Sequence, residues 1–117
     1  PDICIADLEG LCDLILNYEI DGIIATNTTV DYKVLKTMPS QINGGVSGKP
    51  LLNKSNKIIK EIKNYVGDKI KIIGTGGITS SESAMSKLNS GADLLQIYTG
   101  LVYKGTSLIK DVTSGLK

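Results

Sequence analysis

Two glycine-containing segments have the composition and spacing of a phosphate-binding site. Gly74–Ile78 closes one short apolar run, and Tyr98–Gly100 closes another about twenty residues later. One helix-length segment, Ser80–Ser90, lies between them, as it does between successive parallel strands. Backbone amides at such strand ends, together with the Thr99 hydroxyl, can donate hydrogen bonds to phosphate oxygens. The pattern favours a phosphate site over two plain turns.

A run of small polar side chains, Thr26-Asn27-Thr28-Thr29, directly follows the apolar segment Ile23–Ala25. Asn offers two donors and an acceptor, and the Thr hydroxyl can both donate and accept. The run can therefore bind the carbonyl, ring nitrogen and carboxylate groups of a small planar ligand. The same residue types also form and cap turns, and the pattern supports both interpretations equally.

A third segment, Gly44-Gly45-Val46-Ser47-Gly48, ends a long polar loop that runs from Thr26 to about Lys49 and contains Pro39. Three glycines in five residues allow the backbone to approach a ligand closely, whereas a flexible hinge is the alternative. Ser47 and the following Pro50 favour the ligand site. Lys49 is expected to be a solvated loop residue.

Composition excludes several classes of function. The chain has 117 residues, 41% hydrophobic residues and a net charge of +1, which suits one small globular domain without a nucleic-acid or polybasic membrane footprint. It contains no His, Trp or Phe, which excludes His-based catalysis and argues against a base-stacking platform. No apolar run approaches the ~20 residues of a membrane span, and no signal peptide or metal site is predicted.

The cysteines and carboxylates give no catalytic pattern. Cys4 and Cys12 are too far apart for a Cys-x-x-Cys motif and are expected to be reduced and mostly buried. No convincing acid–base pair is predicted from four candidate aspartates, Asp2, Asp21, Asp31 and Asp93. Asp21 and Asp93 each precede a predicted strand and are expected to be structural.

The hydrophobic periodicity predicts helices that alternate with nearly continuous apolar strands. The helices are expected at Asp7–Tyr18, from Pro50 to near Gly67, at Ser80–Ser90 and at roughly Thr106–Leu116; the strands are expected at Ile23–Ala25, Ile70–Ile73 and Leu94–Ile97. Thr79 and Glu82 have the spacing of a capping box. This order predicts an α/β fold with a parallel sheet covered by helices.

Three strands make an incomplete parallel sheet, with two open edges and one unburied face. The repeat is the unit of a (β/α)₈ TIM barrel, which takes ~250 residues. We therefore expect the C-terminal portion of such a barrel, with about three strands and their helices. An open flavodoxin-like sheet is the competing fold.

The chain resembles dihydroorotate dehydrogenase of the class 2, quinone-linked branch. The similarity runs nearly end to end and lies in Pro1-Asp2, Asp21–Thr29 (DGIIATNTT), Gly44–Leu51 (GGVSGKPL), Ile72–Ile78 (IIGTGGI) and Leu95–Gly100 (LQIYTG). The resemblance implies that residues 1–117 are part of an FMN-binding barrel domain. It also implies FMN contacts at Thr26, Gly48, Gly77, Tyr98 and Thr99, the last three on the phosphate. Asn27 and Thr28 would hydrogen-bond the dihydroorotate or orotate ring.

The family reaction passes a hydride from dihydroorotate to the flavin and electrons onward to a quinone, in pyrimidine biosynthesis. The family's Ser base, its first Asn ligands and an FMN-contacting Lys belong to the N-terminal half, so no catalytic residue is assigned here. The helical pair that meets the membrane and the quinone belongs there too. Membrane association, at the bacterial inner membrane or the mitochondrial inner membrane, is implied through that region only.

The chain alone is therefore expected to be an inactive piece of an enzyme. The alternative is a binding module, a half-barrel that grips FMN or another phosphorylated ligand without redox chemistry. The Thr26–Thr29 run distinguishes the two, because a bare phosphate binder does not need it.

Overall fold

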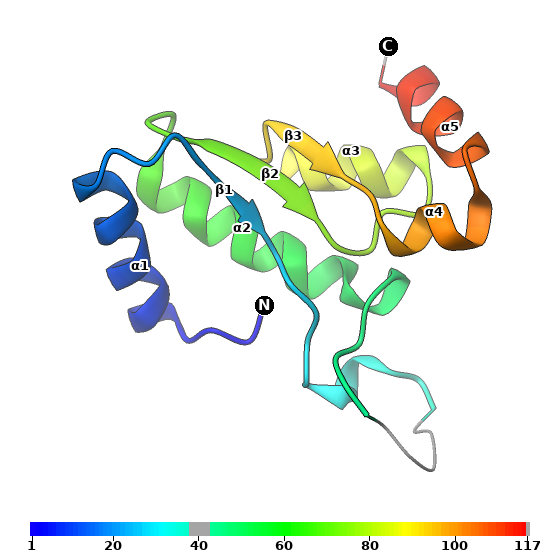
Figure 1. The fold of residues 1–117 in the computed structure, drawn as a ribbon, viewed down its shortest axis with the longest axis horizontal. Coiled ribbons are helices and arrows are strands. Elements are labelled where there is room, and N and C mark those ends of the chain that lie inside the picture. The colour runs from blue at the N-terminus through cyan, green and yellow to red at the C-terminus, as the bar shows by residue number, and fades with distance from the viewer. Residues whose placement is uncertain (38–42, 117) are drawn as a thin grey trace.

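The computed structural model describes residues 1–37 and 43–116 (Figure 1). Five helices and three strands follow one another in the order α1 (Ile5–Asn17), β1 (Gly22–Ala25), α2 (Leu52–Val66), β2 (Lys71–Thr75), α3 (Ser81–Asn89), β3 (Leu94–Gln96), α4 (Thr99–Lys104) and α5 (Ser107–Gly115), with short 3₁₀ turns at Tyr32–Val34 and Lys49–Leu51. The predicted alternation of strands and helices is confirmed. Pro39 of the predicted loop lies outside the described residues.

The three strands form one parallel sheet in the order β1-β2-β3. Ile24 pairs in register with Ile73, and Ile73 pairs with Leu94. Because side chains alternate across a strand, these three residues share one face of the sheet, and Ile72 and Gly74 point to the other. The three carboxyl ends, at Ala25, Thr75 and Gln96, lie together at one edge.

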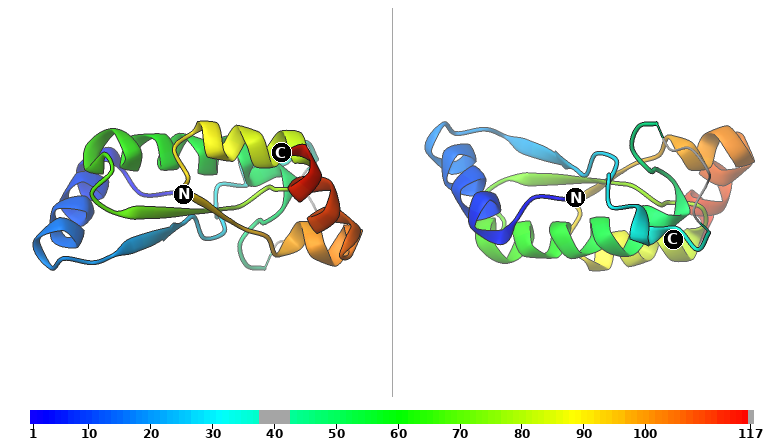
Figure 2. Two further views of the ribbon diagram at one scale, coloured as in Figure 1. Left: turned by 90° about the horizontal axis from the view of Figure 1, so that it is seen from above. Right: turned by 90° about the horizontal axis from the view of Figure 1, so that it is seen from below.

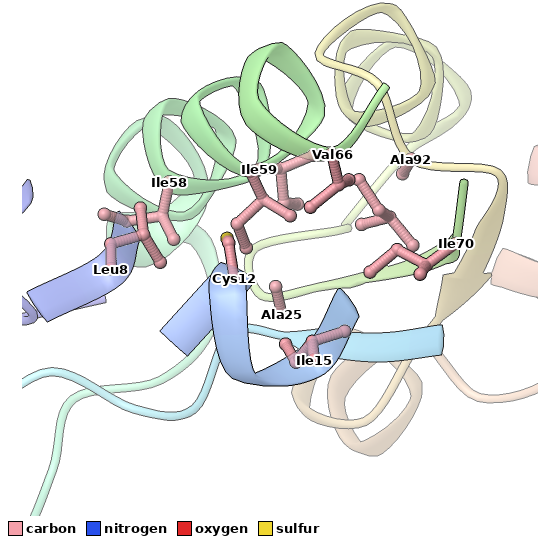
Figure 3. Packing of buried hydrophobic residues seen from close by; sticks show 11 residues of the cluster. Leu8, Cys12, Ile15, Ala25, Ile58, Ile59, Val66, Ile70 and Ala92 are labelled. Carbon is pink, nitrogen blue, oxygen red and sulfur yellow. The ribbon is translucent and has the colours of Figure 1, made fainter. Parts of the chain in front are cut away.

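One face of the sheet is covered by helices. Figure 2 shows α2 and α3 on this face. The main core lies between α1, α2 and the sheet, and Figure 3 shows side chains from these elements gathered in it. Cys12 of α1, Ile59 of α2 and Ile72 of β2 are completely buried there. A second core, built around Ile78 and Leu108, joins α3 to α5.

The opposite face of the sheet has no covering helix in the described part of the chain (Figure 2). Ile24 and Leu94 are 57% and 59% exposed on it, although both are apolar strand residues. Isolated exposed apolar residues are ordinary, but a whole uncovered strand face is not. The face matches the expected inner face of a barrel whose other strands are absent from this chain.

The structure corrects three local predictions. The capping box at the start of α3 is formed by Ser80 and Ser83, not by Thr79 and Glu82. The Ser80 hydroxyl accepts from the Ser83 amide, and the Ser83 hydroxyl accepts from the Ser80 amide. The helix α4 was not predicted. Cys12 is buried as expected, whereas Cys4 is exposed, because its thiol sits at the N-terminal end of α1 and accepts from the Asp7 amide.

Two absences hold for the described residues. None of the helices at 5–17, 52–66, 81–89, 99–104 or 107–115 is long and apolar enough to cross a bilayer. Within 1–37 and 43–116, no group of three or more His, Cys, Asp or Glu side chains could hold a metal ion.

Asp93 has the structural role predicted for it, since its carboxylate accepts from the Ile72 amide at 2.9 Å.

Candidate functional site

A pocket of about 420 Å³ opens at the carboxyl ends of the three strands. Its lining comes from the segment after β1, the glycine segment before α2 and the ends of β2 and β3. The pocket brings together all seven residues to which the family resemblance gives a ligand role: Thr26, Asn27, Thr28, Gly48, Gly77, Tyr98 and Thr99. Parallel strands explain this convergence, because they deliver their following loops to the same edge of the sheet.

The ends of β2 and β3 lie side by side, as predicted. Gly74 pairs in register with Leu95, and Thr75 pairs with Gln96. Beyond this pairing, Gly76 and Gly77 line the same pocket as Tyr98 and Thr99. The Gly77 N–H, beyond the last paired residue of β2, donates no hydrogen bond to another described residue. Free amides at the end of a buried strand are suited to bind an anion.

Two glycines fix the backbone around the pocket. Gly77 has φ +81°, and a Cβ added to it would lie 2.6 Å from the Leu52 backbone, so the turn after β2 packs directly on the start of α2. Gly48 has φ +75°, and its added Cβ would lie 3.0 Å from the Thr99 side chain. Only glycine adopts such angles without strain and permits such an approach. The two turns therefore hold Gly48 against the end of β3.

The Thr26–Thr29 run makes a turn and lines the pocket at once. The Asn27 side-chain oxygen accepts from the Thr28 amide at 2.8 Å, and the Thr26 amide donates to the Thr75 carbonyl at 3.3 Å. These bonds support the turn interpretation. Asn27 still keeps its side-chain NH₂ donors for a ligand, because its hydrogen bond to Thr28 uses only the oxygen. The two interpretations are compatible rather than exclusive.

An ionic cluster outside the pocket holds this run in place. Lys54 of α2 lies between two carboxylates, 2.7 Å from Asp2 and 2.9 Å from Asp31. Asp2 also accepts from the Thr29 hydroxyl at 2.5 Å and from the Val30 amide at 2.8 Å. Asp2 and Asp31 thus share one lysine in an ion-pair cluster.

The cluster shifts the pKa values of its members. Hydrogen bonding from Lys54, followed by Thr29 and the Val30 amide, holds the pKa of the Asp2 carboxyl well below its usual value. The hydrogen bond from Lys54 likewise lowers the pKa of Asp31. The same contacts raise the pKa of Lys54, most through Asp2. All three groups are therefore ionised at neutral pH.

Three further polar residues line the pocket without a ligand role of their own in the sequence analysis: Ser47 and Thr75, which lie in the predicted ligand segments, and Gln96. The Thr99 hydroxyl donates to the Ser47 hydroxyl at 3.1 Å, which ties the glycine segment to the end of β3. Gln96 shares the uncovered face with Leu94, two residues earlier on the same strand. Gln96 could have been found from the sequence, because a polar residue on an otherwise apolar strand indicates a site.

Taken together, fold and pocket define a class of protein: a portion of a (β/α)₈ barrel with its ligand site at the carboxyl ends of the strands. Comparison with known families gives the particular one. The model of the dihydroorotate dehydrogenase family matches residues 1–117, and the chain belongs to that family.

Relatives and solved structures agree with this assignment. The chain is 50% identical to dihydroorotate dehydrogenase (quinone) of Legionella pneumophila (strain Corby) and 39% identical to that of Aliivibrio salmonicida, in each case over 99% of this chain and 35% of the relative. Two crystal structures of the Eimeria tenella enzyme, DHODH, superpose on 99% of the chain. The ligand-free one has a TM-score of 0.89 at 28% identity and 32% coverage of that enzyme, and the ferulenol complex has 0.91 at 29% and 31%. The chain thus spans about a third of the length of the relatives it matches.

Proposed function

We propose that this chain supplies part of the flavin and substrate site of a dihydroorotate dehydrogenase (quinone). The whole protein would oxidise dihydroorotate to orotate with FMN as cofactor and a quinone as electron acceptor, in pyrimidine biosynthesis. One observation carries the proposal: the seven residues chosen by motif converge on one pocket at the carboxyl edge of the sheet. The names of the relatives support the choice of reaction and acceptor.

The phosphate end of the site is assigned to Gly77, Tyr98 and Thr99. The free Gly77 amide after β2 and the Thr99 hydroxyl form a donor set with no carboxylate among the described residues that line the pocket. Such a set fits a phosphate dianion, because amide and hydroxyl donors satisfy its oxygens without a competing negative charge. FMN fits these residues better than riboflavin for the same reason.

The ring end of the site is assigned to the segment after β1. Thr26 and Gly48 would contact the flavin, and Asn27 and Thr28 would hydrogen-bond the dihydroorotate or orotate ring. When bound, FMN supplies the hydride acceptor for the reaction. The residues of this chain orient the two ligands, and Asn27 donates through its NH₂ group to a carbonyl or carboxylate of the substrate.

Proton abstraction is assigned to the part of the protein outside this chain. None of the residues that line the pocket in the described segments is a His, Asp, Glu, Lys or Cys. A general base must lie within hydrogen-bond reach of the proton that it removes. The family resemblance places a serine base in the other half of the barrel, and the pocket's composition is consistent with that division of roles.

Membrane association and quinone binding are proposed for the whole protein. The word quinone in the names of the relatives supports an inner-membrane location, bacterial or mitochondrial. Contact with the membrane would come from a region beyond the segment described.

The test uses the whole protein that carries this chain. We expect the purified protein to bind FMN with the absorbance of a flavoprotein and to reduce a soluble quinone only when dihydroorotate is added. FMN binding without dihydroorotate-dependent reduction would instead support the non-redox module. Failure to bind flavin would contradict the dehydrogenase and would leave only a module for another phosphorylated ligand.

A further inference from the structure

Lys87 of α3 is a completely buried lysine outside the pocket lining. Its ammonium donates to the Ser55 hydroxyl at 2.9 Å and to the Asn56 side-chain oxygen at 2.8 Å, both on α2. It takes part in none of the ion pairs among the described residues. Buried lysines without a carboxylate are rare, because taking the charge out of water is costly. We therefore expect a lysine that is buried at this cost to have a role in the protein.

The fold makes room for this side chain. A Cβ added to Gly74, in the middle of β2, would lie 2.7 Å from the Lys87 Cγ and 2.8 Å from its Cδ. Any larger residue at position 74 would collide with the lysine stem. The stem therefore lies directly on the β2 backbone, just before the strand reaches the pocket.

The hydrogen bonds of Lys87 continue to the pocket through one of its two partners. The Ser55 hydroxyl, which accepts from Lys87, donates in turn to the Thr75 carbonyl at 2.5 Å. That carbonyl also accepts from the Thr26 amide at 3.3 Å. Asn56 leads elsewhere, since its NH₂ group donates to Ser86 on the surface. Only the Ser55 branch ends at a residue that lines the pocket.

Fixing the Thr75 carbonyl also fixes the next amide. The C=O and N–H of one trans peptide are coplanar and point in opposite directions. A Thr75 carbonyl held toward Ser55 and Thr26 therefore turns the Gly76 N–H away from both, to the side of β3. Gly76 has φ +100° and no side chain to restrain it, so this external anchor sets the orientation of the turn.

We propose that Lys87 is a positioning residue for the phosphate site, acting through Ser55 and the Thr75 carbonyl to fix the turn after β2 and so aim the amide of Gly77. The inference rests on the proposed function, because it needs a phosphate at the end of β2. It predicts that the lysine affects the phosphate contribution to flavin binding and not the ring contribution.

The charge of the lysine suits this role. Burial lowers the pKa of Lys87 to about 8, so the group is still mainly an ammonium at neutral pH and keeps all its donors. A charged donor polarises the Ser55 hydroxyl and strengthens its bond to the carbonyl.

The experiment compares FMN with riboflavin, which lacks the phosphate. Flavin-free whole protein is titrated with each ligand, and the ratio of the two dissociation constants measures what the phosphate contributes. Three variants are compared with the wild type: Lys87→Met removes the ammonium, Ser55→Ala removes the relay and keeps the ammonium, and Asn56→Ala removes the branch that does not reach the pocket. Ser55→Ala is the milder change and serves if Lys87→Met does not fold.

Loss of a relay bond to a charged group should cost about a tenfold change in affinity. We expect Lys87→Met and Ser55→Ala to lower the FMN-to-riboflavin preference about tenfold while riboflavin affinity stays within twofold, and Asn56→Ala to leave both unchanged. An unchanged preference in Ser55→Ala would overturn the inference. An equal loss of FMN preference in Asn56→Ala would also overturn the inference. The effect would then come from removing any hydrogen-bond partner of the buried lysine and not from the route through Ser55. A wild type without preference for FMN would instead refute the proposed phosphate site.

Discussion

The Asp2 carboxylate accepts a hydrogen bond of 2.5 Å from the hydroxyl of Thr29, 27 positions along the chain. Its second oxygen accepts from the Val30 amide. This pair joins the segment before α1 to the polar run after β1, two residues beyond Asn27. The placement of the substrate-side donors thus depends on a residue that does not line the pocket.

Replacing Asp2 with Asn should destabilise the whole protein by about 1 kcal/mol at neutral pH, since hydrogen bonds to a charged group are lost. The folded-state pKa of Asp2 lies below its unfolded value of 3.8, so its contribution is fully present above that pH and is lost as pH falls through the folded-state pKa. Denaturant titrations from pH 7 to pH 3 should show a constant difference between wild type and Asp2→Asn down to about pH 4, and a shrinking one below.

A matched control for that series is Asp68→Asn. Asp68 also pairs with a lysine, Lys63 at 2.7 Å, but its side chain is 94% exposed. Exposed pairs contribute little, so this variant should match the wild type closely. An equal loss of stability in both variants would mean that the Thr29 and Val30 contacts add nothing.

Replacing Asn27 with Ala should damage orotate binding far more than FMN binding. A site built to hydrogen-bond a polar ring leaves a ligand group unpaired when one donor is lost, at a cost of ~1–3 kcal/mol. Titration of both ligands against the variant of the whole protein measures this. Asn53→Ala, at an exposed position of α2, is the control. Unchanged orotate affinity combined with loss of flavin binding would show that Asn27 contacts the flavin and not the substrate.

Replacing Gly77 with Ala should destabilise the protein by more than the usual 1 kcal/mol of a positive-φ substitution, and should weaken FMN binding. Its Cβ would meet the Leu52 backbone, which cannot move aside as a flexible side chain can. Gly67→Ala is matched in φ, at +62°, but has open space around its added Cβ. Thermal melts with and without FMN separate the two effects. Similar losses in the two variants would show that backbone strain alone, without the collision, explains them.

Lys87 gives a second pH dependence, which has the same sign as that of Asp2 but lies in a higher pH range. An unfolded lysine keeps its proton up to about pH 10.5, whereas the buried one releases it near pH 8. Between these values the unfolded state binds more protons, so stability rises with pH. Relative to Lys87→Met, the wild type should gain up to roughly 3 kcal/mol between pH 7.5 and 10.5. A flat difference across this range would indicate that water reaches the ammonium.

The isolated 117 residues should bind FMN weakly or not at all and should not oxidise dihydroorotate. The inner sheet face is uncovered, and no His, Asp, Glu, Lys or Cys is among the described residues that line the pocket. Purified chain is mixed with FMN and dihydroorotate, and reduction of a dye is followed. Turnover near the ~1–10³ s⁻¹ of ordinary enzymes would contradict this expectation.

The sequence was sufficient to predict the fold because its strands are continuous apolar runs separated by strongly periodic helices. The pocket was predictable for a related reason: topology places whatever follows parallel strands at one edge, so the motifs after Ala25 and Thr75 had to meet. The helix α4 was not predicted because its six residues are too short a stretch for helical periodicity to be recognised, and it contains Gly100 and is followed by Gly105.

Contacts between distant residues could not be predicted from local pattern. Lysine is an ordinary residue at an exposed helix position, so the local sequence does not mark Lys87 as buried. Its partners lie 31 and 32 residues away on another helix. The Asp2–Lys54 pair likewise joins segments with no periodic relation. Such contacts follow from how helices pack on the sheet, which depends on many weak apolar contacts at once.

The uncovered face carrying Ile24, Ile73 and Leu94 has a consequence for cooperativity. In the barrel of this family the rest of the protein must cover that face, so the free energy of closing it is shared between this segment and the remainder. We therefore expect the segment to unfold together with the rest of the barrel, in one transition. Amide hydrogens of β2, which is paired on both sides, should exchange only when the entire barrel unfolds, and a charge introduced at Ile24 should lower the stability of every strand and not of this one alone.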